Sequence, residues 1–439
     1  MNKVCVMVSN YLNHHQIPFC NAMYQLLGGS FVFVQTEPVE EERIRMGWNE
    51  APMEPYLKLF YEEPEVCRRL IREAEVVIFG GTDDESYIEE RLESGKPVIR
   101  NSERLYKSGQ WKAISPRGLR KKYHDHTRYR KAQVYLLCAG AYVPSDFHIV
   151  HAYPGKMFCW GYFPETRHYD INALLAGKGY ASKESGSIPY LLWAARMIDW
   201  KHPELAVETA EYLRSRGLKF RMDMIGGGEL REQTEAMIRE KGLESYVSLL
   251  GFMRPEQVRE RMEKADVFLF TSDRQEGWGA VANEAMNSGC ALIADHMIGA
   301  VPYLVRHGEN GYVYKDGCRQ ELFTLAERLV KDRKLCSRLG YNAYQTITES
   351  WNAENAAERL ARLCIDKGLL PEEAVGLPNG RVSKTMKPEV TERDEEPKSD
   401  VADGRNDRTV ALGAGPCEPA PVISERRMYR LLTEGKAGL

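Results

Sequence analysis

A strand–loop–helix pattern between residues 266 and 286 constrains the fold of this 439-residue chain more than any other feature. Residues 266–272 form a short apolar run that ends in polar residues, which is typical of a buried parallel strand. A glycine-containing loop follows, and an apolar helical pattern then passes through Glu284. In a parallel sheet, this order directs the unpaired N–H groups of a helix N-terminus at a ligand over the carboxyl edge. The segment therefore predicts an α/β protein with a ligand site at that edge.

Two carboxylates frame this junction, Glu276 in the loop and Glu284 in the helix. Gly277 and Gly279 let the backbone approach a ligand without an intervening side chain. Eight helical residues rise about 12 Å, so the second carboxylate can reach another part of the same ligand. A phosphate over the helix start, with hydroxyls at both carboxylates, describes a nucleotide-sugar. The alternative interpretation is that both glutamates are solvated surface residues.

This segment resembles the retaining GT-B glycosyltransferases that carry a Glu-x7-Glu motif, glycosyltransferase family 4. The resemblance is carried by Gly-Trp-Gly after Glu276, by Glu-Ala-Met at Glu284, by Ser288 with Gly289, and by the strand expected at 291–295. It implies that Glu276 holds hydroxyls of the donor sugar and that Glu284 holds the ribose hydroxyls of the nucleotide. The neighbouring donor-binding candidates are Gly277, Trp278, Gly279 and Ala280. The resemblance covers residues 187–367 strongly and residues 1–165 in outline.

Two cations follow the strand that is expected at 190–196. Arg196 ends that strand, and Lys201 stands five positions later, just before a helical pattern. Ligands of α/β sheets bind at the carboxyl ends of strands, and guanidinium and ammonium groups suit phosphate oxygens. The resemblance implies that both cations neutralise the diphosphate leaving group, so we take them, with the first glutamate, as the catalytic residues. The chain departs from the family at Ala195 and His202, where glycine is frequent, and the alternative is a pair of surface cations.

Two further segments of the second half are donor-site candidates. A glycine run at 226–228 precedes a helical pattern, which makes Gly227 a candidate for backbone contact with the nucleotide, although a plain tight turn explains the run nearly as well. The resembled family binds its base after the strand that is expected here at 247–250, so Met253 is a second candidate. Because those contacts use the main chain, the side chains do not distinguish uracil from guanine.

The first half offers acceptor-side candidates. Asn13, His14 and His15 follow the first expected strand, where many family members have glycines close to the donor phosphates. Two histidines near a cleft can donate hydrogen bonds to an acceptor or a diphosphate, or relay a proton, but they are equally ordinary at a helix start. After the fifth strand the family often has a histidine that touches the donor sugar, and this chain has Glu103 there, next to Ser102.

A dense basic segment runs from Arg117 to Lys131, with seven Lys or Arg residues against one Asp. Such a run suits an anionic membrane surface or the phosphates of an acceptor. A solvated loop or helix is the third interpretation. One basic patch on a chain of net charge −3 argues against nucleic acid as a partner.

Strand and helix patterns alternate along most of the chain and divide it into a first unit, residues 1–178, and a second unit, residues 187–350. Strands of the first unit are expected at 3–10, 31–36, 57–61, 76–80, 97–101 and 134–139, and helices near 17–27, 64–73 and 84–93. Strands of the second unit are expected at 190–196, 221–225, 247–250, 267–271, 291–294 and 312–313, and helices at 203–216, 229–241, 255–264, 279–288 and 319–331, followed by helical stretches at 332–349 and 353–367. The alternation predicts parallel sheets covered by helices. The expected architecture is GT-B, two facing Rossmann-like domains, with a closing helix in residues 351–370 that packs back on the first unit.

The remaining segments are expected to lie outside the two units. Residues 179–187 are polar and are typical of an interdomain linker. From Pro371 to the end, the chain holds seven of its 21 prolines and neither Phe nor Trp, so we expect residues 371–439 to be mostly disordered. Within them, residues 424–433 have helical spacing behind a Ser N-cap, and a frayed amphipathic helix is favoured over a docked one.

Composition limits the cellular setting. No apolar run approaches the ~18 residues of a transmembrane helix, and the first apolar run is too short for a signal peptide. The ten cysteines include no CxxC pair, which indicates reduced thiols in a cytosolic protein. No acidic cluster of metal-binding type accompanies the candidate site, and the resembled fold usually works without a metal, so neither metal nor cofactor is expected. We expect a cytoplasmic protein, with peripheral contact at the inner face of the membrane through the basic segment.

These features predict a retaining transfer of a sugar from a UDP- or GDP-sugar to a hydroxyl of a carbohydrate or lipid-linked acceptor. The expected setting is the synthesis of cell-surface polysaccharide or glycolipid. An alternative from another class is a non-catalytic nucleotide-sugar-binding subunit or sensor on the same fold. A nicotinamide-dependent dehydrogenase is disfavoured because residues 8–13 carry no G-x-G-x-x-G after the first strand.

Overall fold

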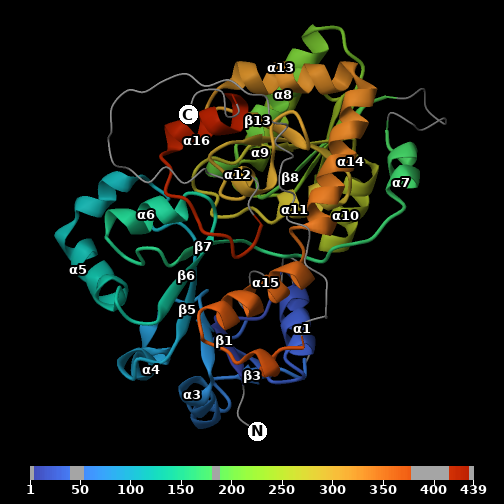
Figure 1. Ribbon diagram of the computed structural model, residues 1–439. Helices are drawn as coiled ribbons and strands as arrows, with labels where there is room; N and C mark the ends of the chain where they lie inside the picture. Colours follow the sequence, from blue (N-terminus) through green and yellow to red (C-terminus); the bar gives the residue numbers. More distant parts are fainter. Residues whose placement is uncertain (1–3, 40–53, 180–187, 377–414, 435–439) are drawn as a thin grey trace, which may run out of the picture.

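The computed structural model describes residues 4–39, 54–179, 188–376 and 415–434 (Figure 1). Within them the chain forms two parallel sheets, one in each expected unit, with helices packed on their faces. The predicted α/β class with two Rossmann-like units is therefore confirmed. Most of the expected linker at 179–187 lies outside the described residues, as do residues 377–414 of the expected disordered tail.

The sheet of the first unit has seven parallel strands in the order β3-β2-β1-β4-β5-β6-β7. The strands are β1 (Cys5–Ser9), β2 (Phe31–Gln35), β3 (Leu57–Leu59), β4 (Val76–Phe79), β5 (Val98–Ser102), β6 (Val134–Ala139) and β7 (Met157–Trp160). The helices are α1 (Ile17–Leu26), α3 (Pro64–Glu73), α4 (Glu89–Glu93), α5 (Pro116–Asp125), α6 (Val143–Ile149) and α7 (Ile171–Gly177), and the 3-10 turns are η1 (Glu85–Tyr87), η2 (Gln110–Ile114) and η3 (Thr127–Tyr129). The six strands predicted for this unit are confirmed. β7 was not predicted, because a run of four apolar residues cannot be told from a buried loop by periodicity.

The sheet of the second unit has six parallel strands in the order β10-β9-β8-β11-β12-β13. The strands are β8 (Tyr190–Ala194), β9 (Arg221–Ile225), β10 (Val247–Gly251), β11 (Val267–Phe270), β12 (Ala291–Asp295) and β13 (Gly311–Tyr314). The helices are α8 (Pro203–Ser215), α9 (Arg231–Glu240), α10 (Pro255–Lys264), α11 (Val281–Asn287), α12 (Val301–Leu304), α13 (Arg319–Lys331) and α14 (Arg333–Glu349), with the 3-10 turn η4 (Asp199–Lys201). All six predicted strands are present. The central strands β8, β11 and β12 are short and buried almost throughout, as expected of a parallel sheet with helices on both faces.

Helix α15 (Ala353–Asp366) leaves the second unit and packs against α1 of the first unit (Figure 1). Asn352 caps it by accepting a hydrogen bond from the Asn355 N–H at 2.8 Å. Its buried face consists mainly of small residues at helical spacing, namely Ala353, Ala356, Ala357, Leu360, Ala361 and Cys364. Small side chains let the two helix axes approach closely. The 3-10 turn η5 (Glu372–Ala374) follows.

Residues 415–420 pair with the free edge of the first sheet. The N–H groups of Cys417 and Ala420 donate to the carbonyls of Cys159 and Met157 at 2.8 and 2.9 Å, and Phe158 forms an antiparallel bridge with Pro419. The segment therefore covers edge strand β7, whose unpaired backbone groups would otherwise be exposed.

Helix α16 (Glu425–Glu434) then packs on both units, contrary to the expectation of a frayed helix. The predicted N-cap is present, since Ser424 Oγ accepts from the Arg427 N–H at 3.4 Å. On the first unit, Glu425 forms an ion pair with Arg104 at 3.1 Å, and on the second unit the Tyr429 hydroxyl donates to Glu321 at 2.8 Å. The apolar side chains that α16 buries are Met428, Leu431 and Leu432. The prediction of a helix is right and that of fraying is wrong, because distant parts of the chain supply the docking surface.

Candidate active site

The order of the second sheet locates a crevice between two central strands. The chain starts at β8, adds β9 and β10 on one side, and then adds β11 to β13 on the other. Ligands of open α/β sheets bind outside the carboxyl ends of the strands where the order reverses, which here means β8 and β11. The loop after β8 carries Arg196 and Lys201, and the loop after β11 carries Glu276. The candidate catalytic residues therefore share one crevice.

Lys201 and Glu276 form an ion pair across this crevice, with side chains that are 12% and 11% exposed. Thr271, at the end of β11, fixes the lysine loop because its hydroxyl donates to the Lys201 carbonyl at 2.7 Å. The Trp193 indole N–H donates in turn to the Thr271 hydroxyl at 2.9 Å. These contacts place an ammonium group and a carboxylate side by side at the expected diphosphate and sugar positions.

Arg196 is joined to this pair through an aromatic ring. Its guanidinium lies 5.9 Å from the centroid of the Trp200 ring, and the Lys201 ammonium lies 4.2 Å from the same centroid. Arg196 itself is exposed. Cation–π contacts of this length hold long side chains in place while leaving their N–H groups able to donate. The spacing that the sequence indicated thus brings both cations around one tryptophan, which sequence reasoning did not select.

His202 completes the lysine loop in the left-handed region, with φ of 51°. A non-glycine residue there is uncommon, which explains why glycine is frequent at this position in the resembled family. Its Nδ1 lies 2.8 Å from Glu204 Oε1 and its Nε2 lies 3.5 Å from Asp273 Oδ2. Hydrogen bonds to Asp273 and Glu204 raise the pKa of His202 to about 10, so the imidazolium is charged at neutral pH. Of the two acidic partners, Glu204 is close in sequence and was the signal that could have identified this group, whereas Asp273 is remote.

The glycines after Glu276 are required by their surroundings. Gly279 has φ of 94°, and a Cβ there would lie 2.5 Å from the Phe270 ring. A Cβ on Gly277 would lie 1.9 Å from Glu103 Oε2, so the carboxylate of the first unit rests against this loop. Among the described residues, none accepts a hydrogen bond from the N–H of Gly277 or Gly279. These groups can therefore donate to a bound anion.

The side chains of Trp278 and Ala280 are buried in the protein, while donor contact through the backbone of residues 277–280 stays a prediction. The Trp278 side chain is fully buried, its indole N–H donates to Asn283 at 2.9 Å, and its ring packs over Gly161 of the first unit. It is a core residue between the units, so a side-chain contact with a donor is excluded in this arrangement. Ala280 is buried at the N-cap of α11, which begins at Val281 instead of the expected residue 279.

Glu284 lies in α11, the helix that follows the loop with Glu276. Burial raises the pKa of Glu284, and the nearby Arg259 and Arg167 partly offset that rise. Arg259 also donates to Asn287, three residues along the same helix. A partly desolvated carboxylate that lies near two cations can accept hydrogen bonds from the hydroxyls of a ribose. The structure places it on the same loop–helix unit as Glu276, without a direct contact to Lys201.

The two weaker donor candidates lie beside the Arg196 loop. The Gly227 carbonyl accepts from the Met197 N–H at 2.8 Å, which joins the glycine run to that loop. A Cβ on Gly227 would lie 2.6 Å from the Phe252 ring, which is exposed above it. Met253 follows and is partly buried. Both positions line the β9 and β10 side of the crevice.

The first unit covers this crevice directly. The Ala141 N–H donates to the Gly299 carbonyl at 2.9 Å, and the Tyr142 hydroxyl donates to the His296 carbonyl at 2.6 Å. Both acceptors follow β12 at the carboxyl edge of the second sheet. The two units are thus in contact around the site, as a bisubstrate enzyme that excludes water would require.

The acceptor-side candidates divide between local and interunit roles. Asn13 is a helix-start residue, because its Oδ1 accepts from the His15 N–H at 3.0 Å and its carbonyl accepts from the Ile17 N–H at 3.1 Å. The rings of His14 and His15 lie 3.9 Å apart. Burial lowers the pKa of His14, although Glu256 of the second unit opposes the shift, so His14 is neutral at pH 7 and faces the other unit.

Glu103 occupies the interface between the units. Its Oε1 accepts from the Tyr162 hydroxyl at 2.6 Å, and its Oε2 pairs with Lys107 at 2.6 Å while lying against Gly277. Of the four acceptor-side candidates, it is therefore the one placed at the glycine loop that follows Glu276. The sequence indicated its position after β5, but not the residues that hold it.

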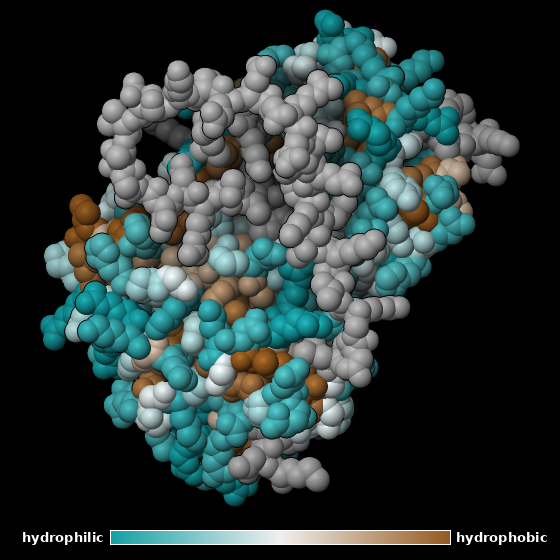
Figure 2. Space-filling view, viewed as in Figure 1, coloured by the Kyte–Doolittle hydropathy of each residue, from teal (hydrophilic) through white to brown (hydrophobic). Residues whose placement is uncertain are grey.

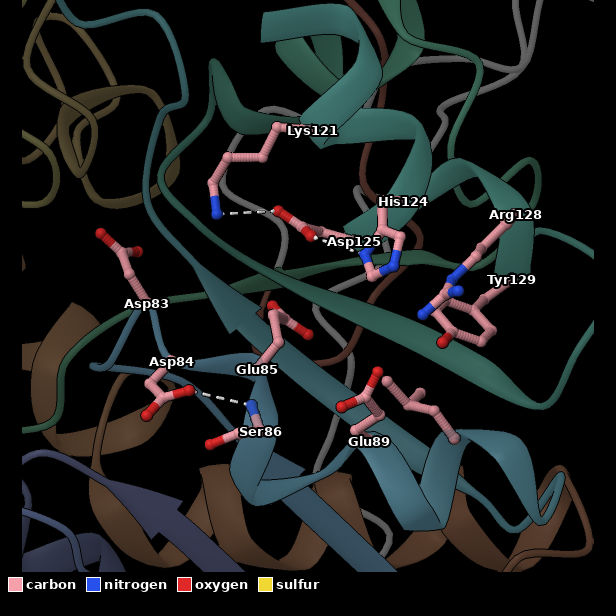
Figure 3. Close-up of a pocket in the computed structure, with 11 residues that line it drawn as sticks. Asp83, Asp84, Glu85, Ser86, Glu89, Lys121, His124, Asp125, Arg128 and Tyr129 are labelled. Carbon is pink, nitrogen blue, oxygen red and sulfur yellow. Dashed lines mark hydrogen bonds and ion pairs between the residues drawn. The ribbon is translucent and has the colours of Figure 1, made fainter. Parts of the chain in front are cut away.

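The basic segment forms one wall of a polar cavity of about 270 Å³ in the first unit (Figure 3). Lys121, His124 and Arg128 project from α5 and η3 on one side, and four acidic residues line the other, Asp83, Asp84, Glu85 and Glu89. Glu85 is neutralised by a bidentate pair with the buried Arg100, at 2.6 Å for each bond. Donors and acceptors on opposite walls suit a polyhydroxylated ligand better than a purely anionic one.

Residues 4–39, 54–179, 188–376 and 415–434 contain no group of three or more His, Cys, Asp or Glu side chains arranged to hold a metal ion. Over the same ranges, no helix has both the length and the apolar character needed to span a bilayer.

Comparison with known proteins agrees with this geometry. A sequence model described as "Glycosyl transferases group 1" matches residues 181–346. The amylovoran biosynthesis glycosyltransferase AmsK of Erwinia amylovora is 30% identical over 144 residues, which cover 32% of this chain and 35% of that protein. The α-D-kanosaminyltransferase of Streptomyces kanamyceticus is 28% identical over 181 residues, which cover 41% and 46% of the two chains. These matches span less than half the length of each relative, and the family model falls on the second unit.

Solved structures share the fold over both units. HepE of Anabaena in complex with UDP has a TM-score of 0.59 at 13% identity, covering 83% of this chain and 100% of that one. The sucrose-phosphate synthase of Thermosynechococcus elongatus has a TM-score of 0.59 at 13% identity, covering 83% and 99% of the two chains. The fold of this chain is therefore GT-B.

Proposed function

We propose that this protein is a retaining glycosyltransferase of the family 4 type, which moves a sugar from a nucleoside-diphosphate sugar to an acceptor hydroxyl. The observation that carries the proposal is the Lys201–Glu276 pair in the crevice between β8 and β11, beside Arg196. A cation and a carboxylate at the reversal point of the sheet suit the two halves of an activated sugar. The names of the relatives and the match of residues 181–346 support the same reaction class.

In the proposed reaction, the bond between the anomeric carbon and the diphosphate oxygen breaks, and its electron pair stays on the diphosphate. The acceptor oxygen bonds to that carbon on the same face, and its proton passes to the departing diphosphate oxygen. Arg196 and Lys201 would stabilise the departing diphosphate, together with the N–H groups of Gly277 and Gly279. Preorganised donors at developing charge supply the largest catalytic term in many enzymes. Glu276 would hold sugar hydroxyls, and the ammonium of Lys201 keeps that carboxylate in position.

Glu284 would bind the ribose, and the loops that follow β9 and β10, which carry Gly227 and Met253, would lie against the base. The donor is proposed to be a UDP- or GDP-sugar. HepE was solved with UDP, and one relative is named as a GDP-mannose-dependent mannosyltransferase. Calorimetric titration with UDP and GDP decides between the two bases, because a Kd at least tenfold lower for one of them identifies the donor.

The acceptor is proposed to be a carbohydrate or a lipid-linked saccharide that binds on the first unit. Relatives are named as glycosyltransferases of amylovoran and colanic acid biosynthesis and as a poly(ribitol-phosphate) α-N-acetylglucosaminyltransferase, which supports this class of acceptor. The mixed-charge cavity beside α5 and the interface around Glu103 and His14 are the candidate acceptor surfaces. The proposed location is the cytoplasm, at the inner face of the membrane.

A turnover assay separates this function from a nucleotide-sugar sensor on the same fold. With the donor identified by calorimetry, the enzyme should release UDP or GDP only when an acceptor extract is present. Nucleotide binding with no acceptor-dependent release by the wild type would support the sensor instead. Release that is unchanged in a Glu276→Gln variant would also count against the proposed site. No binding of either nucleotide would remove both interpretations.

A further inference from the structure

Exposed apolar side chains gather on one short segment of the first unit. Among the described residues, eight large hydrophobic side chains are strongly exposed, and four of them lie between residues 111 and 123. They are Trp111, Ile114, Leu119 and Tyr123, which are 69%, 80%, 41% and 60% exposed. Single exposed hydrophobic residues are ordinary, but a cluster on one element marks an interaction surface. Figure 2 shows hydrophobic residues at the left margin of the molecule, near the place where Figure 1 labels α5.

Basic side chains alternate with these apolar ones. Lys112 lies beside Trp111, with its ammonium 5.7 Å from the centroid of the indole ring. Arg117 and Arg120 are exposed on α5, and no ion pair between described residues involves either of them. The acidic residue of this helix, Asp125, is buried and paired with Lys121 at 3.2 Å. The exposed part of the segment is therefore apolar and cationic, with no exposed carboxylate on α5.

The geometry of α5 separates two faces. Lys121, His124 and Asp125 point into the polar cavity (Figure 3). Leu119 and Tyr123 are four residues apart, so they share a face, and at 100° per residue Arg120 adjoins it on the side away from Asp125. The acidic wall of the cavity thus faces the side of α5 that is turned away from Leu119 and Tyr123, and the free cation Arg120 lies beside the apolar face.

We propose that the surface formed by Trp111, Ile114, Leu119 and Tyr123, with Lys112 and Arg120, docks on an anionic lipid bilayer. An exposed tryptophan and exposed aliphatic side chains gain little from a soluble phosphate, but they are stabilised at the boundary between headgroups and acyl chains. The surrounding cations match the negative potential of anionic lipids. The docking does not depend on the proposed sugar transfer, although it would bring the first unit to a lipid-linked acceptor.

The test is co-sedimentation of the full chain with vesicles of phosphatidylcholine alone or with 3:1 phosphatidylcholine and phosphatidylglycerol. The wild type should bind the anionic vesicles at least tenfold more tightly, and more weakly as salt rises. The combined Trp111→Ser, Ile114→Ser, Leu119→Ser and Tyr123→Ser variant should lose at least tenfold in affinity. Lys112→Ser with Arg120→Ser should lose roughly 10- to 30-fold, at about 1 kcal/mol for each cation.

Matched controls are available on the same chain. Tyr61→Ser removes another exposed aromatic residue, and Arg333→Ser with Lys334→Ser removes two exposed cations from α14. Both should bind vesicles as the wild type does, and all variants should keep the wild-type melting temperature, since the replaced side chains are exposed.

Three results would overturn the proposal. One is equal binding of the wild type to neutral and anionic vesicles, or wild-type binding by both surface variants. Another is displacement by inorganic phosphate beyond that of sodium chloride at the same ionic strength, which would assign the cations to a soluble anion. The third is a concentration-dependent dimer that the four-residue variant abolishes while vesicle binding persists, which would assign the surface to a second copy.

Discussion

The two units turn the carboxyl edges of their parallel sheets toward the same crevice, but they place different chemistry there. In the second unit, the loops after β8 and β11 carry free or paired charges, Arg196, Lys201 and Glu276, on a backbone of small residues. In the first unit, the corresponding loops are engaged in protein contacts. Asn13 organises the start of α1, and Glu103 is held by Tyr162 and Lys107 against Gly277. The difference indicates that the second unit holds the activated group and that the first unit closes and shapes the site.

The difference between the two units is tested most directly at two carboxylates beside Gly277, Glu276 of the second unit and Glu103 of the first. Glu276→Gln keeps the size of the side chain but removes the charge next to Lys201. We expect turnover to fall roughly 10²- to 10³-fold, as when one preorganised transition-state contact is lost, with the nucleotide Kd within threefold of wild type. Steady-state kinetics with the identified donor measures the turnover, and calorimetry measures the nucleotide Kd.

Glu103→Gln is the matched change in the first unit. Because this carboxylate accepts from Tyr162 and contacts the glycine loop, its loss should raise the acceptor KM or lower turnover by less than tenfold. Equal losses from the two variants would show that the chemistry is shared between the units, and the contrast drawn above would then fail.

The cations give the second test. Arg196→Ala with Lys201→Ala should weaken nucleoside-diphosphate binding by about 10- to 100-fold, because the charge-assisted hydrogen bonds of these two side chains to phosphate should together contribute about 1.5–3 kcal/mol, Arg196 being exposed to solvent. Calorimetry with UDP and GDP measures the change. Arg239→Ala, an exposed arginine on α9 of the same unit, is the control and should leave the Kd unchanged. A wild-type Kd in the double variant would remove both residues from the site.

How far the sequence predicted these features depends on how local each cause is. Arg196, Lys201 and Glu276 were found because each follows an apolar strand within a few residues, and the strand fixes where it emerges. Donor contact through the backbone of residues 277–280 stays a prediction, but the packing of the Trp278 side chain between the units was not predicted. An aromatic residue between two glycines is as typical of a core as of a ligand contact, and the partners that bury it, Gly161 and Trp351, are remote in sequence.

Contacts between residues that are remote in sequence also account for what the sequence missed in the first unit and near the C-terminus. The contact between Glu103 and Gly277 joins two domains, so no local pattern contains it. β7 is too short to show a period, and α5 was left open between a loop and a helix. Composition favoured a frayed helix near the C-terminus, since that segment alone cannot bury enough apolar surface. The pocket for Met428 is supplied by the rest of the protein.

Helix α16 contacts both units, through Arg104 on the first and Glu321 on the second, so its docking can be tested by its effect on stability. Met428→Ala should lower the free energy of unfolding by about 2–3 kcal/mol, as expected for truncating a buried methionine. Chemical denaturation with urea measures it. Arg430→Ala, on the exposed side of the same helix, should change the free energy of unfolding by less than 0.5 kcal/mol. Equal effects of the two would mean that α16 is not docked in solution.

The smallest expected effect concerns His202, where backbone strain and charge can be separated. Its pKa in the folded protein is raised to about 10 by Asp273 and Glu204, from an ordinary value near 6.5. The charged form therefore stabilises the fold fully below about pH 6.5, and this contribution is lost as the pH rises toward 10. His202→Asn tolerates the left-handed backbone but carries no charge, so it should unfold more easily than wild type by roughly 1 kcal/mol at pH 6, after allowance for solvent screening. The difference in Tm between the two proteins should shrink as the pH rises from 6.5 to 10. His202→Gly removes the charge and relieves the strain at φ of 51°, so it should be more stable than the Asn variant by a similar amount at every pH. A Tm difference between wild type and His202→Asn that does not change with pH would show that the imidazolium is not paired in this loop.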